Sequence, residues 1–113
     1  MTLGEIIRHV DTVKPNAFSA EDKILWLNEV EFELQTDVLG VTEDFSSHGT
    51  EAGWESDEML IPEAFHRVYT SYLTARIDAA SSEWEEYAND IQLYNAFRGQ
   101  YERWYARTYV DEV

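Results

Sequence analysis

Residues 61–109 read IPEAFHRVYTSYLTARIDAASSEWEEYANDIQLYNAFRGQYERWYARTY and decide the fold of this chain. Large side chains recur along this stretch at alternating spacings of four and three, which is typical of one buried helical stripe. The stripe comprises Tyr69, Leu73, Ile77, Ala80, Trp84, Tyr87, Ile91, Tyr94, Tyr101 and Tyr105. A single helix over 62–107 would be about 69 Å long, whereas a compact chain of this size has a radius of gyration of about 13 Å. The segment is therefore expected to fold back as a helical hairpin.

The turn of this hairpin is expected within 81–90. Two patterns that resemble capping boxes compete for the start of the last helix, Ser82 with Glu85 and Asn89 with Gln92. The sequence does not choose between them. Pro62 fits the first turn of the helix before the bend, because its missing N–H costs nothing there. The last helix is expected to end near Arg107.

Two shorter helices are expected before the hairpin. A T-x-x-E pattern at Thr2 and Glu5 predicts the start of the first, which Lys14-Pro15 ends. Ser19 is expected to cap the second helix, and Gly40 to terminate it. The inward face of the second helix is assigned to Ile24, Leu27, Leu34 and Val38, flanked by Trp26 and Val30, and its surface to Glu29, Glu31, Glu33 and Asp37. The fold class is thus a single all-α domain over 1–113, a short helix pair followed by a long hairpin.

Residues 41–59 show neither a helical nor a strand period and predict a long acidic loop. No basic residue lies between Lys23 and Arg67, whereas eleven acidic ones do. Connections of this length are usually functional or mobile. Trp54 is unexpected in such a segment, and it either packs on the core or anchors a partner.

The chain of 113 residues has a formal net charge of −15 and contains no cysteine. This charge disfavours direct wrapping of nucleic acid, since phosphate binding relies on Lys and Arg, and no sequence-specific nucleic-acid binding is expected. The negative charge can keep the protein soluble, it can bind a basic partner, or it can line a passage to which DNA must not adhere. Apolar runs are too short for a membrane helix, and no signal peptide is evident, so the chain is expected to start in a cytoplasm.

No pattern in the chain specifies a catalytic chemistry. Glu63 and His66 form an E-x-x-H pattern, which a di-iron site in a four-helix bundle uses twice. Glu5 and His9 are four residues apart instead of three, so they do not supply the second copy. Neither a nucleophile elbow nor a glycine-rich phosphate loop is present. The chain is therefore expected not to be an enzyme, with no catalytic, cofactor-binding or metal-binding residues. A carboxylate-rich metalloenzyme is a rival reading that elemental analysis would decide.

Aromatic and arginine side chains gather near the C-terminal end of the hairpin. Such residues are enriched at interface hot spots, although aromatics at helical spacing also build cores. Arg98, Arg103 and Arg107 suit the negative end of the helix dipole, or alternatively dock on an acidic surface, including the 29–63 region of a neighbouring copy. The candidate interface residues are Trp54, Tyr101, Trp104, Tyr105, Arg107 and Tyr109.

Several phrases of the sequence resemble the small head–tail connector (adaptor) proteins of tailed bacteriophages and prophages. They are K-P-N-x-F-S at 14–19, W-L-N-E-V-E at 26–31, L-I-P at 60–62, YTSYLTARID at 69–78, residues 83–87, L-Y-N-A-F at 93–97 and W-Y-A-R at 104–107. The resemblance covers nearly the whole chain except the loop at 41–59. Where members often carry Asn-Gly before the glutamate, this chain has Ser81-Ser82.

The resemblance implies a helical structural protein of the virion without catalytic residues. Members dock on the portal protein of a filled capsid, meet other head–tail joining proteins, and repeat as a homo-oligomeric ring around the DNA passage. The implied location is the head–tail junction, with the host cytoplasm before assembly. The alternative function is an acidic DNA mimic that inhibits a host nucleic-acid-binding protein, and the acidic stretch between Lys23 and Arg67 motivates it.

Overall fold

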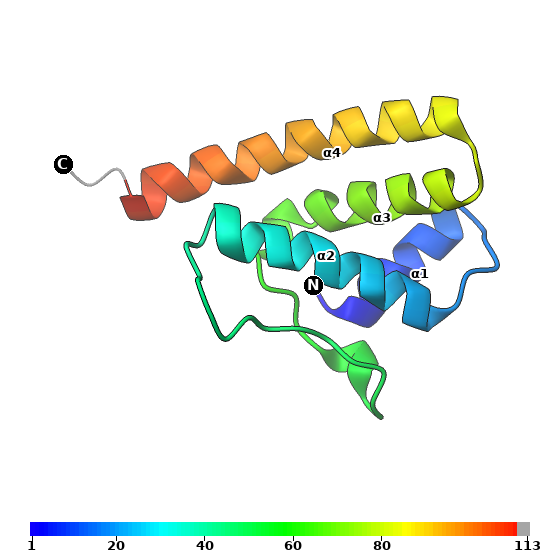
Figure 1. Cartoon of the computed structure of the whole chain (residues 1–113), viewed down its shortest axis with the longest axis horizontal. Helices are drawn as coiled ribbons and strands as arrows, with labels where there is room; N and C mark the ends of the chain where they lie inside the picture. The colour runs from blue at the N-terminus through cyan, green and yellow to red at the C-terminus, as the bar shows by residue number, and fades with distance from the viewer. Residues whose placement is uncertain (111–113) are drawn as a thin grey trace.

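A computed structural model describes residues 1–110 of the chain and shows an all-α protein, as the sequence predicts (Figure 1). Its main helices are α1 (Leu3–Val13), α2 (Ala20–Asp37), α3 (Arg67–Ala80) and α4 (Trp84–Tyr105). Two 3-10 turns, η1 (Trp54–Ser56) and η2 (Glu63–Phe65), lie in the long connection, and a π-helical turn, η3 (Ala106–Val110), continues α4. Within the described residues, no helix has the length and apolarity that a membrane span requires.

The hairpin of α3 and α4 is present, and it bends at the start of the expected window. Ser82 takes a left-handed φ of +57°, and the Glu83 N–H donates to the Asp78 carbonyl at 2.9 Å. Neither predicted capping box forms. The residue that precedes α4 is Glu83, which gives no side-chain cap, and Asn89 lies inside the helix. The molecule measures 49 Å along its longest axis, well below the length of one straight helix.

The third helix begins at Arg67 rather than at Pro62. Pro62 instead precedes the short turn η2, with ψ at 149°, because its backbone stays extended where the connection enters the hairpin. Phe65, at the end of η2, still packs against the core. The apolar surface of α3 therefore continues into the preceding turn η2.

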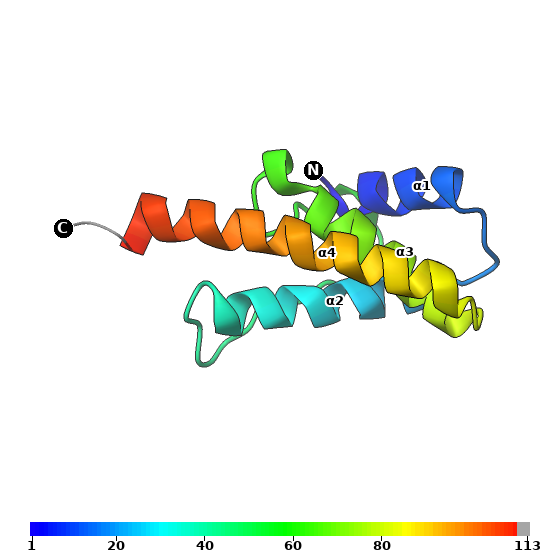
Figure 2. The same ribbon diagram turned by 90° about the horizontal axis from the view of Figure 1, so that it is seen from above.

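Burial along the hairpin is uneven, and this corrects the expectation of one buried stripe. The α3 half is covered, with Tyr69, Leu73 and Ile77 no more than 1% exposed. On α4 only Tyr94 and Tyr101 are buried, while Trp84 is 62% exposed. The reason is that α4 is the outer layer of the molecule (Figures 1 and 2). Seen from above, α1 and α2 lie on opposite sides of the hairpin (Figure 2).

The N-terminal helices begin and end where the sequence predicts. The Thr2 hydroxyl accepts from the Glu5 N–H at 3.2 Å, and the Glu5 carboxylate accepts from the Thr2 N–H at 3.1 Å, so the capping box is complete. The Ser19 hydroxyl accepts from the Asp22 N–H at 3.1 Å. Gly40 takes a left-handed φ of +71° beyond the end of α2. Local hydrogen bonding therefore defines both helices before any tertiary packing.

One assignment on α2 is wrong. Glu31, expected on the surface, is 2% exposed, and its neighbours on the same side, Lys23 and Gln35, are also buried. Glu31 and Gln35 are covered because the connection between α2 and α3 runs back along the helix instead of projecting into solvent (Figure 1), whereas Lys23 pairs with Asp11 of α1 at 2.8 Å. One side of the polar surface of α2 is thus internal, while Glu33 and Asp37 stay exposed.

Candidate functional site

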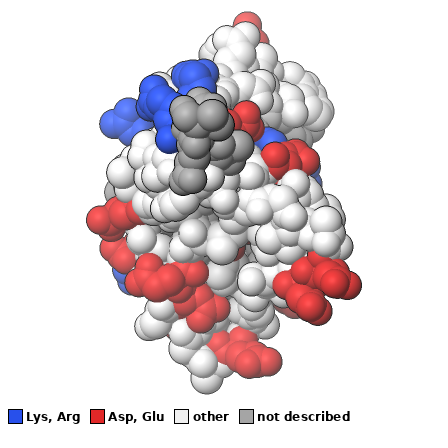
Figure 3. All heavy atoms as spheres, turned by 90° about the vertical axis from the view of Figure 1, so that its left-hand side faces the viewer, with Lys and Arg blue, Asp and Glu red and all other residues white. Residues whose placement is uncertain are grey.

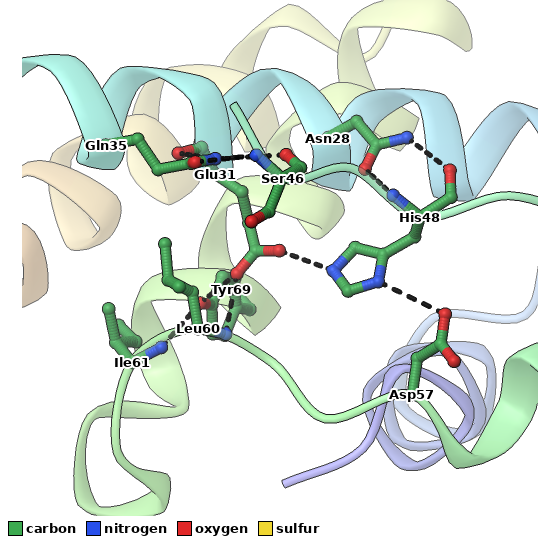
Figure 4. A network of polar contacts seen from close by, with 9 residues as sticks. All are labelled: Asn28, Glu31, Gln35, Ser46, His48, Asp57, Leu60, Ile61 and Tyr69. Carbon is green, nitrogen blue, oxygen red and sulfur yellow. Dashed lines mark hydrogen bonds and ion pairs between the residues drawn. The ribbon is translucent and has the colours of Figure 1, made fainter. Parts of the chain in front are cut away.

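Two carboxamide side chains of α2 hold the long loop (Figure 4). The Asn28 amide donates to the His48 carbonyl at 2.8 Å, and its oxygen accepts from the His48 N–H at 2.8 Å. Gln35 repeats this pairing with the backbone of Ser46, at 3.1 and 2.9 Å. A carboxamide offers one acceptor and a donor side by side, as a neighbouring strand would. These bonds satisfy the backbone of Ser46 and His48, and farther along the loop Glu58 pairs with Thr2 in an isolated antiparallel β-bridge.

Glu31 lies between the two carboxamides and is the centre of a buried polar network (Figure 4). One of its oxygens accepts from the Tyr69 hydroxyl at 2.6 Å and from the Leu60 N–H at 2.8 Å. The other oxygen lies 2.5 Å from His48 Nε2. Tyr69 in turn accepts from the Ile61 N–H at 3.1 Å. A buried carboxylate is tolerated because its acceptor positions are filled and a cation can face it.

The ionisation of His48 follows from these contacts. Its hydrogen bond with Glu31 raises the pKa of the imidazole, burial opposes that change, and Asp57, 3.4 Å away, adds to the rise. The pKa of Tyr69 is also raised, by burial first and then by the Glu31 carboxylate, so the phenol stays a donor. Protonated His48 and Glu31 form an ion pair that locks the loop onto α2.

A second polar cluster joins α1 to the hairpin turn. Asp78 is fully buried, and Lys14 Nζ lies 2.5 Å from its Oδ1 and 3.0 Å from Glu83 Oε2. Hydrogen bonding to Asp78 is the main cause that raises the pKa of Lys14. Burial, followed by a hydrogen bond with Asp78, raises the pKa of Asp90 to about 7. This cluster fixes where the outer helix starts.

Four of the predicted interface residues lie together at the end of α4, a surface we call the α4 tip. Trp104 and Tyr105 are half-buried, whereas Arg107 and Tyr109 are exposed. Tyr109 packs on both aromatic rings, with centroid separations of 5.8 Å and 4.8 Å. Arg103 completes the tip, and no carboxylate among residues 1–110 lies within 4.0 Å of Arg103 or Arg107.

The other two predicted interface residues differ from this group. Tyr101 is 2% exposed and packs edge-on against Phe65 at 5.3 Å, so within the single chain it belongs to the core. Trp54 lies in η1, which Figure 1 places far from the end of α4. Trp54 is half-buried against the core and lines a hollow of about 400 Å³ together with His48 and Asp57.

The structure also reveals an apolar groove on α2 that the sequence reading missed, here called the α2 groove. Leu25, Phe32 and Phe45 are 57%, 51% and 37% exposed and line a hollow of about 770 Å³. Glu29 and Glu33 stand in its wall. Leu25 and Phe32 are seven residues apart, so they lie on the same side of α2. This spacing indicates a second apolar stripe opposite the core, and it could have predicted the groove from the sequence.

Charge is distributed unevenly over the end of the molecule where α4 finishes (Figure 3). Acidic side chains spread over much of this face, whereas most of the basic atoms in view gather at one corner. The basic side chains that form ion pairs do so with carboxylates of the same chain. Arg98, for example, forms ion pairs with Asp37 at 2.8 Å and with Glu102 at 2.6 Å. The prediction that Arg98 docks on another molecule therefore has no support.

Metal-ligating geometry is not found among residues 1–110, where no three His, Asp or Glu side chains converge on one point. His66 of the E-x-x-H pattern bonds through Nδ1 to the Glu63 carbonyl at 3.0 Å. Comparisons with protein-family models, with curated proteins and with solved structures find no match to this chain.

Proposed function

We propose that this chain is a structural protein of the head–tail junction of a tailed bacteriophage or prophage. In this role it docks on the portal protein, meets other head–tail joining proteins, and repeats as a homo-oligomeric ring that forms part of the DNA passage. It acts in the virion after a period in the host cytoplasm. It performs no reaction of its own.

The observation that carries this proposal is where the connector-like phrases meet in space. Three of them converge on the network of Figure 4: W-L-N-E-V-E provides Asn28 and Glu31, L-I-P provides Leu60 and Ile61, and the Y-T-S-Y phrase provides Tyr69. These phrases are up to 38 residues apart in sequence. Together these residues hold the long loop in place, as a protein that docks on others through a loop requires.

The charge of the held loop supports the same role. Apart from Asp57, which faces His48, its carboxylates are exposed: Glu43, Asp44, Glu51, Glu55 and Glu58. A ring that presents such a surface to its lumen repels phosphate, and DNA then passes without adhering.

The proposal is tested by mixing the purified chain with the portal protein encoded beside its gene. Co-sedimentation is the readout, and electron microscopy of the complex locates the acidic loop. We expect a complex in which the loop faces the channel. A folded chain that leaves the portal unbound, or a ring whose lumen is lined with Arg and Lys, would defeat the proposal.

The outward carboxylates also favour a second candidate, an acidic DNA mimic. A mimic binds a basic host protein tightly at low salt and releases it as salt screens the charges. Affinity capture from host extract at low and high salt separates the two functions. Recovery of a nucleic-acid-binding protein that DNA displaces would support the mimic, whereas failure to recover one would count against it.

A further inference from the structure

The α2 groove and the α4 tip are complementary in charge, and both expose apolar side chains. The groove is lined by apolar residues with two carboxylates in its wall, and the tip is an aromatic surface with two arginines. Glu29 and Glu33 are 41% and 47% exposed, and their own cations, Arg76 and Arg98, approach them no closer than 3.5 and 3.4 Å. Both carboxylates therefore retain capacity for a closer basic partner.

The tip cannot fill the groove of its own chain. It is fixed beside the far end of α2, where Tyr105 and Ala106 share a hollow with Asp37 and Val38. Phe32 and Leu25 precede Val38 by 6 and 13 residues, which is about 9 and 20 Å along a helix. Trp104 is also held in place by Phe65, whose ring centroid lies 5.1 Å away.

We infer that the α4 tip of one copy docks in the α2 groove of a second copy of this chain. Tyr109 and Trp104 cover the apolar floor of the groove, and Arg103 and Arg107 face Glu29 and Glu33. This inference rests on the proposed function only in one respect, namely that several copies of the chain assemble side by side. The surfaces themselves follow from exposure, charge and the distance that separates them along α2.

Such a contact has a direct structural consequence. Each chain carries one tip and one groove, and the contact joins two different surfaces, so it is heterologous. Repetition gives a ring if the rotation closes and an open filament if it does not. Because its charged part is exposed, the contact weakens with salt.

The test uses two variants that each lose one side of the contact. R103E/R107E reverses the tip charges, and L25K/F32K places two cations in the groove. All four positions are exposed, so we expect both proteins to keep the circular-dichroism spectrum of the wild type. Sedimentation velocity at low salt should show wild-type association that rises with concentration, and at least a tenfold loss of that association in each variant alone.

Mixing the variants gives the decisive result. L25K/F32K keeps an intact tip and R103E/R107E keeps an intact groove, so an equimolar mixture should restore the association that neither variant shows alone. V13K and R8E are matched controls, since Val13 is exposed and both positions lie outside the two surfaces; they should associate like the wild type. If L25K/F32K fails to fold, E29K/E33K replaces it.

Three outcomes would overturn the inference: a wild type that stays monomeric up to about 1 mM at low salt, variants that associate as well as the wild type, or a mixture that does not pair. The portal protein is absent from this experiment, so its result is separate from the proposed function. Self-association without portal binding would support the tip-to-groove contact and contradict the proposed function. Portal binding without tip-to-groove pairing would support the proposed function and contradict the contact.

Discussion

Replacement of Glu31 by alanine should loosen the long loop, which Asn28 and Gln35 still hold at two points, and destabilise the whole protein. The carboxylate accepts from Tyr69 and from the Leu60 N–H and faces His48, and all of these groups would lose their partner at once. Removal of one member of a buried charged pair costs about 3–5 kcal/mol. A domain of this size is stable by about 5–15 kcal/mol, so E31A should retain only part of the stability of the wild type.

The isosteric variant E31Q separates loss of charge from loss of contacts. A glutamine oxygen can still accept from both Tyr69 and Leu60, while its amide can donate to a neutral His48. What is lost is the charge assistance of these bonds, so we expect a smaller cost of about 1–3 kcal/mol.

The matched control is E33A, on the same helix. Glu33 also accepts from a tyrosine, Tyr94, at 3.1 Å, but its side chain is 47% exposed and water can replace it. Its removal should cost less than about 1 kcal/mol. Urea denaturation measures the free energies of unfolding, and hydrogen exchange follows the Leu60 and His48 amides. If E31A were as stable as E33A and these amides stayed protected, the reasoning would be refuted.

Other consequences concern pH and backbone packing. The pKa of His48 is raised in the folded state, so the contribution of its protonated form to stability is complete below the unfolded pKa of about 6.5 and is lost as pH rises through the folded pKa. Chemical denaturation between pH 6 and pH 9 should therefore show a declining free energy of unfolding, and H48Q should flatten that decline. The pKa of Asp90 is raised to about 7, so stability should also fall from about pH 4 to pH 7, and D90N should remove that slope; an unchanged slope would refute the assignment. A Cβ on Gly4 would lie 2.8 Å from both Cβ and the carbonyl oxygen of Glu55, so G4A should cost about 1–3 kcal/mol by thermal denaturation, whereas G49A, with open space around it, should be nearly neutral.

Local signals in the sequence predicted the helices well because their causes are local. The capping box at Thr2, the cap at Ser19 and the left-handed Gly40 each depend on hydrogen bonds that span at most six residues, and all appear as expected. The hairpin was predictable from length and period alone. Its exact bend was not, because Ser82 adopts a left-handed conformation that a serine rarely takes, and no pattern announces it.

The buried network was beyond sequence reasoning for a physical reason. An acidic residue on an amphipathic helix is normally solvated, and Glu31 is an exception only because His48, Leu60 and Tyr69 reach it from 17, 29 and 38 residues away. Those partners are fixed by the path of the loop, which no periodicity encodes. The same limit applies to the α4 tip: aromatic spacing predicted the cluster, but only the packing of Phe65 shows that Tyr101 is covered while Tyr109 is not.

The measurement that tests the account most directly is quantitative mass spectrometry of phage particles purified from cells that carry the gene. A head–tail adaptor predicts the chain in every intact particle, in a fixed ratio to the portal protein. Its absence from intact particles, with the chain found instead on a host nucleic-acid-binding protein, would contradict the account.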